Sequence, residues 1–312
     1  MKKYLSNLVI VLVLLTSIST YAWDATGHII VAQIAYDNLT PIAKKDIDDL
    51  FKTTGFSKQF PTFSPYIYSA PWPDYLNYDI KAPKGNAEDI FDFWKNVTIS
   101  WHYINDPIVI GNFQPPKISP NNSVFAVQYL IQALSEAINR KQYNLAIYDL
   151  IFLTHIIGDI HQPLHSSTLY DKDFPNGDLG GNYYKIHSSF GATELHAAWD
   201  GSLGRFENWP HFSGRPGYHP PQSLVENTAM QFESACNQQA NDTDPNTWEK
   251  EAHDIAMNFV YPMHNSSAPK PNDSLTQNYI TSGQAVAAKQ MCLAGKRLAA
   301  VLNNEFTSSI TK

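Results

Sequence analysis

The sequence has few cysteines, a shortage of basic residues and few long apolar runs, and each shortage excludes a class of protein. Its two cysteines, Cys236 and Cys292, are too few for a cysteine-rich metal site. Lysine and arginine total 22 against 29 aspartates and glutamates, which gives a formal net charge of −7. A protein that grips nucleic acid through lysine and arginine would be basic. Any binding of phosphate must therefore use another source of positive charge, and bound metal ions are one such source.

An apolar run stands at the start of the chain, where Met1–Ala22 has the pattern of a secretory signal peptide. Two lysines precede the run Leu8 to Leu15, and Ala22 is a small residue suited to cleavage. The run is too short to span a membrane, and a retained N-terminal anchor is the alternative. We therefore expect one domain of residues 23–312 that begins at Trp23, is secreted or periplasmic, and has no stable membrane association.

Strand signals are scarce, and most of the chain carries apolar residues at helical spacing. The predicted helices span residues 27–39, 41–51, 121–141, 143–160, 193–200, 224–240, 246–263 and 274–306. We expect an all-α, single-domain fold with long connections, such as 53–71 and 202–221, and with room for one short hairpin in 171–190. Long connections in a compact domain often carry function. Cys236 and Cys292 fall in two predicted helices, and an exported location allows a disulfide between them.

Histidine and aspartate recur at a spacing of four residues in two of these helices. His155 and Asp159 form one pair, His196 and Asp200 form another, and His165 lies between the pairs in the sequence. Residues four apart on a helix share a face. A single pair of this kind is usually a solvated helix face, but the first pair lies in an apolar helix, where an uncompensated carboxylate is costly to bury. Imidazole and carboxylate together suit zinc, so we predict that these residues are metal ligands.

Further ligand candidates lie upstream, next to bulky rings. Asp74 and His102 are flanked by aromatic residues, and Trp23 and His28 stand at the start of the predicted mature chain. Taken one at a time, His28 and His102 would more often be hydrogen-bonded core histidines. Only together with the two helical pairs do they indicate a metal site.

The set as a whole resembles the trinuclear-zinc type I nuclease family, the single-strand nucleases and 3'-nucleotidases of fungi, plants and microbes. The matching segments are Trp23-Asp-Ala-Thr-Gly-His28, Trp72-Pro-Asp74, Trp101-His-Tyr-Ile-Asn105, His155-Ile-Ile-Gly-Asp159-Ile-His-Gln-Pro-Leu-His165, Gly180-Gly-Asn182 and Leu195-His196-Ala-Ala-Trp-Asp200. Beyond Asp200 the resemblance is only general. The family shares its fold with the zinc-dependent phospholipases C, so the resemblance implies a helical zinc phosphoesterase.

The resemblance implies three zinc ions per chain. The ligands of one zinc would be Asp74, His102, His155 and Asp159. The ligands of a neighbouring zinc would be the free amine and carbonyl of Trp23, with His28 and Asp159. The ligands of the third would be His165, His196 and Asp200. Asp159 would bridge two ions, and removal of the signal peptide would be needed to free the amine of Trp23.

The same resemblance implies that the protein cleaves single-stranded DNA and RNA to 5'-phosphate products and removes phosphate from 3'-nucleotides. Zinc-activated water would attack phosphorus. The catalytic residues would be Asp74, Asp159 and Asn182. Asn182 would contact the phosphate, and Tyr103 would stack on a base, a contact that is indifferent to sequence. Asn105 would touch the base edge or serve only as a turn residue.

Two departures from the family pattern concern the substrate. Many members have an arginine where this chain has Asn77, so a phosphate contact is missing unless Lys81 or Lys84 replaces it. Residues 170–177 form an insertion that could reshape the mouth of the site. Among the other histidines, His161 is expected to orient a ligand through a hydrogen bond. No usable partner spacing is found for His187, His211, His219, His253 and His264.

Two alternatives to a nuclease stay open. A zinc-dependent phospholipase C would use the same three ions and would need an open apolar mouth for lipid chains. A non-catalytic, zinc-stabilised secreted binding module would also need the ligands. A purely structural zinc site is normally closed, and a ligand shared by two metals favours hydrolysis instead.

Overall fold

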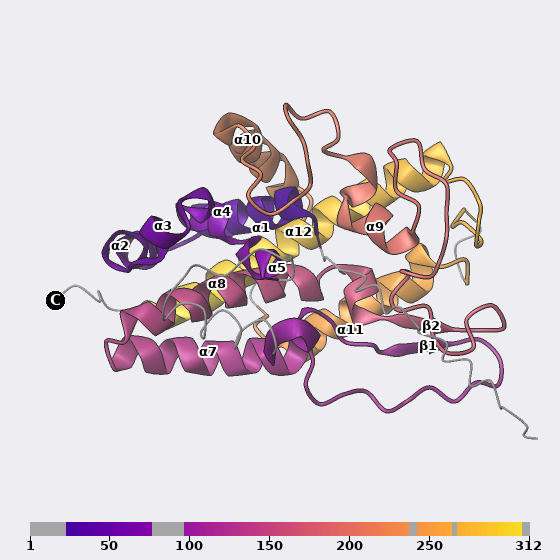
Figure 1. The fold of residues 1–312 in the computed structure, drawn as a ribbon, viewed down its shortest axis with the longest axis horizontal. Coiled ribbons are helices and arrows are strands. Elements are labelled where there is room, and N and C mark those ends of the chain that lie inside the picture. Colours follow the sequence, from indigo (N-terminus) through magenta and orange to yellow (C-terminus); the bar gives the residue numbers. More distant parts are fainter. Residues whose placement is uncertain (1–22, 77–96, 237–241, 264–266, 308–312) are drawn as a thin grey trace, which may run out of the picture.

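The computed structural model describes residues 23–76, 97–236, 242–263 and 267–307, and helices dominate the fold (Figure 1). The longer helices are α1 (Ala25–Asp37), α2 (Pro41–Thr53), α7 (Ser123–Asn139), α8 (Tyr143–Ile160), α10 (Gln222–Glu233), α11 (Pro245–Ile255) and α12 (Gln277–Glu305). The shorter α-helices are α3 (Phe56–Gln59), α4 (Tyr66–Ser69), α5 (Trp72–Tyr75) and α9 (Leu195–Asp200). The 3-10 segments are η1 (Pro61–Phe63), η2 (Ile99–His102), η3 (Pro163–Ser166) and η4 (Ser202–Gly204), and one π-helical turn is η5 (Ala256–Val260).

Local sequence signals set where the main helices begin. Asp24 precedes α1, and its carboxylate accepts hydrogen bonds from the backbone N–H groups of Thr26 and Gly27 at 2.9 and 3.0 Å. Asn122 caps α7 in the same way through the N–H of Phe125 at 3.0 Å. These caps satisfy donors that have no partner inside the helix. The predicted all-α fold is confirmed, and α8 begins and ends at the predicted residues.

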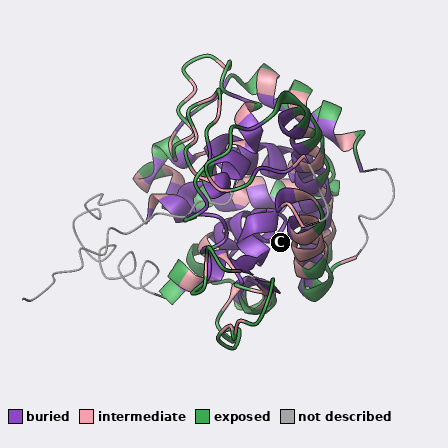
Figure 2. Ribbon diagram, turned by 90° about the vertical axis from the view of Figure 1, so that its right-hand side faces the viewer, coloured by how far each residue is buried: buried purple, intermediate pink, exposed green. Residues whose placement is uncertain are grey.

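Helix α8 runs through the middle of the molecule and is nearly encircled by other helices. It packs against α7, and also meets α1, α2 and α12. Buried residues gather on these central helices, whereas exposed residues lie on the outer ones (Figure 2). Every residue of α8 from Leu150 to Ile160 is buried, so the two ligand candidates on this helix lie in the protein interior. Among the described residues, no helix is long and apolar enough to cross a membrane.

The segments expected to be loops hold more local structure than their sequences indicate. The connection 53–71 contains α3, η1 and α4, because its aromatic residues pack into the core. Helix α10 ends at Glu233, so Cys236 lies just beyond it rather than inside a helix. Cys236 nevertheless forms a disulfide with Cys292 of α12.

The strands pair differently from the expected hairpin. Strand β1 (Pro107–Val109) lies parallel to β2 (Thr168–Tyr170). In the segment 171–190, the pairing is limited to isolated bridges such as the antiparallel one between Lys185 and Glu194. A parallel pair joins segments distant in sequence, so no local turn signal could indicate it. Its effect is to bring the chain after His102 beside the chain after His165.

Candidate metal centre

The structure brings eight of the predicted ligand residues together from six elements. These are His28 of α1, Asp74 of α5, His102 of η2, His155 and Asp159 of α8, His165 of η3, and His196 and Asp200 of α9. All eight are buried. Their ligand atoms form three groups of the kind that holds a metal ion. The groups are His28, His155 and Asp159; Asp74, His102 and His155; and His165, His196 and Asp200.

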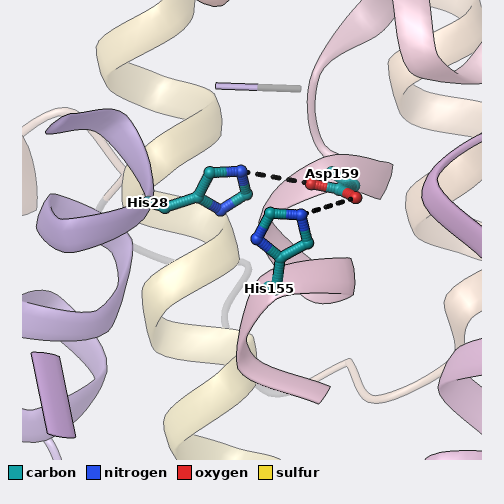
Figure 3. Close-up of side chains that lie close together, drawn as sticks. All are labelled: His28, His155 and Asp159. Carbon is teal, nitrogen blue, oxygen red and sulfur yellow. Dashed lines mark ion pairs between the residues drawn. The ribbon is translucent and has the colours of Figure 1, made fainter. Parts of the chain in front are cut away.

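The first two groups share His155 and surround the carboxylate of Asp159. His28 Nε2 lies 3.3 Å from Asp159 Oδ1, and His155 Nε2 lies 3.4 Å from Oδ2, so the two oxygens face different imidazoles (Figure 3). His102 Nδ1 lies 2.9 Å from Oδ2. On the far side, Asp74 Oδ1 lies 3.4 Å from His155 Nε2. Asp159 therefore occupies the bridging position between two ligand groups.

The third group is built on α9 and on the turn that follows α8. His196 Nε2 lies 3.4 Å from Asp200 Oδ2 and 3.0 Å from His165 Nε2. Gln162 donates to Asp200 Oδ1 at 2.6 Å and fixes that carboxylate. Gln162 is a contributor that the sequence pattern did not single out, although it lies between two predicted ligands.

Backbone carbonyls fix the orientation of three imidazoles. The Nδ1 atom of His155 lies 2.8 Å from the carbonyl oxygen of Ala70. The Nδ1 atoms of His165 and His196 each lie 2.6 Å from a carbonyl oxygen, of His102 and Gly180 respectively. A carbonyl can only accept, so each Nδ1 carries the proton and each Nε2 presents a lone pair to its group. This arrangement is typical of histidines that bind metals.

Several buried atoms of the first two groups have no hydrogen-bond partner among the described residues. They are both ring nitrogens of His28, His102 Nε2, Asp74 Oδ1 and Asp159 Oδ1. An unpaired buried carboxylate oxygen or imidazole nitrogen is costly. A cation bound within each group would pair with those unpartnered atoms that point into the group. The residues present therefore fit a metal centre.

Burial also sets the protonation of these groups. It raises the pKa of Asp159 and of Asp200 well above the usual carboxyl value. It lowers the pKa of His28 well below the usual value, and the neighbouring histidines lower it further. A metal requires carboxylates that are ionised and imidazoles that are neutral. The neutral imidazole of His28 is thus ready for a metal, and the metal's charge would let the carboxyl groups of Asp159 and Asp200 ionise.

The predicted substrate residues line one cavity of about 200 Å³ beside the third group. Its lining residues are Ile99, Tyr103, Asn105, Leu164, His165, Leu179, Gly180, Asn182 and His196. Asn182 is buried and donates through Nδ2 to the carbonyl of Leu179 at 2.7 Å. Asn105 is exposed and accepts from Thr168 Oγ1 at 2.9 Å. The cavity thus joins possible metal ligands to residues that can contact an organic group.

The loop that carries Asn182 needs glycine at residue 180. Gly180 has a φ of +59°, and a Cβ there would lie 2.3 Å from the carbonyl oxygen of Leu164. The close approach lets the Gly180 carbonyl accept from His196. The buried Asp178 anchors the same loop, because it accepts from Leu169 N at 2.9 Å and from Tyr261 Oη at 2.6 Å. Residues 170–177 lie between Leu169 and Asp178, which are joined by this hydrogen bond, and none of residues 170–177 lines the cavity.

His161 does not contact a ligand side chain in the way the sequence suggested. Its Nδ1 donates to the carbonyl of Ile157 at 2.7 Å, and its Nε2 accepts from Arg297 Nη1 at 2.9 Å. It therefore ties the end of α8 to α12. Asn77, Lys81, Lys84 and His264 lie outside the described residues.

Comparison with known proteins identifies the family. The sequence model for S1/P1 nucleases matches residues 23–307. This chain belongs to the S1/P1 nuclease family. Endonuclease 3 of Arabidopsis thaliana is 27% identical over 301 residues, which cover 92% of this chain and 90% of that protein. Nuclease S1 of Aspergillus oryzae is 28% identical over 190 residues, which cover 59% of this chain and 55% of that protein.

Membership of the S1/P1 family makes the chain a nuclease, and it confirms the resemblance carried by the sequence motifs. Among solved structures, Alpha Toxin from Clostridium Absonum aligns with 93% of this S1/P1 chain and 65% of its own, at 14% identity and a TM-score of 0.44. That likeness is too weak to carry an argument.

Proposed function

We propose that the chain binds three zinc ions in the three ligand groups. The observation that carries the proposal is the set of oriented imidazole nitrogens that face buried carboxylates. Imidazole with carboxylate suits zinc. The first zinc would take Asp74, His102, His155 and Asp159. The second would take His28, Asp159 and the amine and carbonyl of Trp23. The third would take His165, His196 and Asp200.

Trp23 is in the right region to complete the second set. Its ring is buried, and a Cβ on Gly27 would lie 2.5 Å from the Trp23 Cβ. Trp23 thus packs against Gly27 in the first turn of α1, and His28 is the next residue of that helix. Its amine becomes free only if the chain is cut after Ala22. The Cys236–Cys292 disulfide supports the matching proposal that the mature protein, residues 23–312, is secreted or periplasmic.

The proposed reaction is hydrolysis of phosphate esters, which releases 5'-phosphate products from nucleic acid and inorganic phosphate from 3'-nucleotides. Bound zinc would supply a Lewis acid and a water molecule with a pKa near neutrality. Asp159 would hold the first two ligand groups at a fixed separation, and Asp74 would complete the first of them. Asn182 lies beside the third group, and its amide has a second N–H that can donate to a phosphate oxygen.

The cavity supports a preference for single strands. Tyr103 and Asn105 line the same cavity as His165 and His196. An aromatic ring can stack on any base, and the Asn105 side chain can hydrogen-bond to a base edge. A base can enter such a pocket only after it leaves the duplex stack, which costs a few kcal/mol. Single-stranded DNA and RNA avoid that cost.

A zinc-dependent phospholipase C activity is a second candidate, and the rim of the cavity favours it. Ile99 is 59% exposed and Leu179 is 42% exposed, and both line the cavity. Apolar side chains at the mouth could contact lipid chains. Leu179 also has a φ of +53°, which is unusual for a leucine. The base-stacking residues Tyr103 and Asn105 leave the nuclease as the first choice.

The test is a zinc count and a substrate panel on the protein that begins at Trp23. Zinc is measured per chain, and hydrolysis is followed on single-stranded DNA, single-stranded RNA, a 3'-nucleotide and phosphatidylcholine, with and without chelator. We expect about three zinc ions and chelator-sensitive release of 5'-nucleotides. Lipid cleavage alone would move the enzyme to the phospholipase function. Bound zinc with no hydrolysis would favour the non-catalytic binding module and would contradict the proposal.

A further inference from the structure

A strained loop holds Asn182 beside the third ligand group. Leu179, Gly180 and Gly181 have φ angles of +53°, +59° and +85°. The left-handed region suits glycine, but it costs free energy for leucine because the Cβ atom approaches the backbone. The side chain of Leu179 gains little in return, since it is 42% exposed at the rim of the cavity. The benefit of this conformation therefore lies in the backbone of the loop.

The backbone of Leu179 fixes the side chain of Asn182. The Leu179 carbonyl accepts from the backbone N–H of Asn182 at 3.2 Å and from its Nδ2 at 2.7 Å. One N–H of the side-chain amide is thereby used, and the other stays available to a phosphate oxygen. Tyr183 N closes the loop, because it donates to the carbonyl of Asp178 at 3.0 Å. A displacement of Asp178 would therefore move Asn182 as well.

Asp178 is held in turn by a tyrosine from a distant part of the chain. The Asp178 side chain is buried, and it accepts from Tyr261 Oη at 2.6 Å and from Leu169 N at 2.9 Å. Tyr261 is also buried and directly follows the π-helical turn η5, where its N–H donates to the carbonyl of Ala256 at 3.0 Å. Turns of this kind are frequent at functional sites. Strained backbone persists only where the surrounding structure holds it, and these hydrogen bonds provide that support.

We propose that Tyr261 is a positioning residue, which acts through Asp178 to hold the Asn182 amide against the substrate phosphate. The inference rests on the proposed phosphate contact of Asn182. Tyr261 does not line the cavity, so an effect of its hydroxyl on turnover must pass through the loop. The contacts expected for the base, from Tyr103 and Asn105, come from a different segment and should not depend on Tyr261.

The test is a double-mutant cycle between Tyr261→Phe and Asn182→Ala in the zinc-loaded enzyme. The kcat and KM on a 3'-nucleotide, the Kd for inorganic phosphate and the zinc content per chain are measured for all four proteins. Misplacement of a reacting group by about 1 Å can cost about 100-fold, so we expect Tyr261→Phe to lower kcat by about 10-fold with little change in KM. In the Asn182→Ala background, the same substitution should change kcat by less than about 2-fold, because the two residues act as one unit. The Kd for phosphate should rise in Tyr261→Phe and should rise no further in the double variant than in Asn182→Ala.

The matched control is Tyr184→Phe. Tyr184 is buried in the same apolar cluster as Tyr261, and its hydroxyl donates to the carbonyl of Pro269 at 2.8 Å instead of to Asp178. The control therefore loses a buried tyrosine hydrogen bond without releasing the loop. Its kcat and its Kd for phosphate should equal those of the wild type.

Zinc content separates an effect on Asn182 from an effect on the metal. The Gly180 carbonyl lies 2.6 Å from His196 Nδ1, so a loop that moved far enough to disturb this ligand would also release zinc. Loss of zinc from Tyr261→Phe would overturn the proposal, and so would equal effects of Tyr261→Phe in the two backgrounds. Unchanged kcat and phosphate affinity in Tyr261→Phe would overturn it too. A wild type that hydrolysed no 3'-nucleotide would contradict the proposed function, and the phosphate affinities would still test the role of Tyr261.

Discussion

Asp159 links the two sides of the site, since its two oxygens face His28 on one side and His102 and His155 on the other. We predict that Asp159→Asn lowers kcat/KM by about 100-fold or more, because changes even to residues that support a metal ligand cost about 10–100-fold. With chelator present, the variant should be no less stable than the wild type, because it no longer buries a carboxylate. Activity assays and urea unfolding with and without chelator would measure both effects.

The control for this variant is Asp149→Asn, which changes a buried carboxylate of α8 outside the ligand groups. It should keep nearly full activity and zinc content. If Asp159→Asn also kept full activity, the bridging role of Asp159 would be wrong.

Asp149 itself predicts a pH dependence of stability. Burial raises its pKa from 3.8 to about 7 in the folded protein. The folded state therefore holds a proton that the unfolded chain releases above pH 3.8. The resulting stability is fully present below about pH 4 and is lost as pH rises through about 7, by up to roughly 4 kcal/mol at 1.36 kcal/mol per pKa unit.

The variant Asp149→Asn should remove this contribution. Urea unfolding from pH 4 to pH 8 would compare its free energy of unfolding with that of the wild type. We expect the free energy of unfolding of the variant to increase relative to that of the wild type as pH rises. Parallel pH profiles would show that Asp149 is ionised in the folded protein at neutral pH.

At the scale of elements, α8 works as a platform because another helix can approach it at Gly158. A Cβ at this residue would lie 2.9 Å from His28 Nδ1. The His28 ring cannot easily retreat, because it stacks on His155 with ring centroids 3.9 Å apart. Glycine is unfavourable inside a helix by about 1 kcal/mol relative to alanine, so its presence here serves the contact between α1 and α8 rather than the helix.

We predict that Gly158→Ala lowers activity about 10-fold through weaker zinc binding, even though alanine favours the helix. Zinc affinity and kcat/KM would be measured beside the control Gly55→Ala, whose added Cβ meets nothing within 4 Å. Unchanged zinc affinity in Gly158→Ala would mean that His28 is not a ligand or that its ring can move freely.

At the scale of the whole molecule, the disulfide closes a long loop between the end of α10 and α12. Cys236 and Cys292 are 56 residues apart and pack with Leu293 in a small cluster separate from the two main cores. The chain-entropy argument gives about 4 kcal/mol for a loop of this length. Replacing both cysteines by alanine should lower the free energy of unfolding by roughly that amount. Urea unfolding would measure it.

Zinc content and activity of the folded double-alanine variant should stay unchanged, because the ligand groups lie outside this cluster. A urea midpoint equal to that of the wild type would show that the unfolded chain gains no conformational entropy when the disulfide is removed. A loss of zinc would show that the disulfide also supports the site.

Sequence and structure agree best where one helix carries the whole signal. The bounds of α8 and the shared face of His155 and Asp159 follow from helical periodicity, which acts within a few residues. Agreement is weaker where a structure depends on contacts between segments that are distant in the sequence. The parallel contact of β1 with β2 and the short helices in 53–71 depend on what packs against them, and propensity is a weak guide there.

The candidate site also has features that the sequence predicts and features that only the fold decides. The sequence alone determined which residue types were available, since histidine and aspartate at helical spacing in an apolar segment leave few uses other than metal binding. It did not reveal that His253 has a partner. Asp106, whose Oδ2 lies 3.7 Å from His253 Nδ1, is distant in the sequence, and only the tertiary packing of α11 brings the two residues together. Ligand identity is a property of the local chain, whereas the separation of ligand atoms is a property of the fold, because each pair of atoms is held by elements that meet only in the folded core.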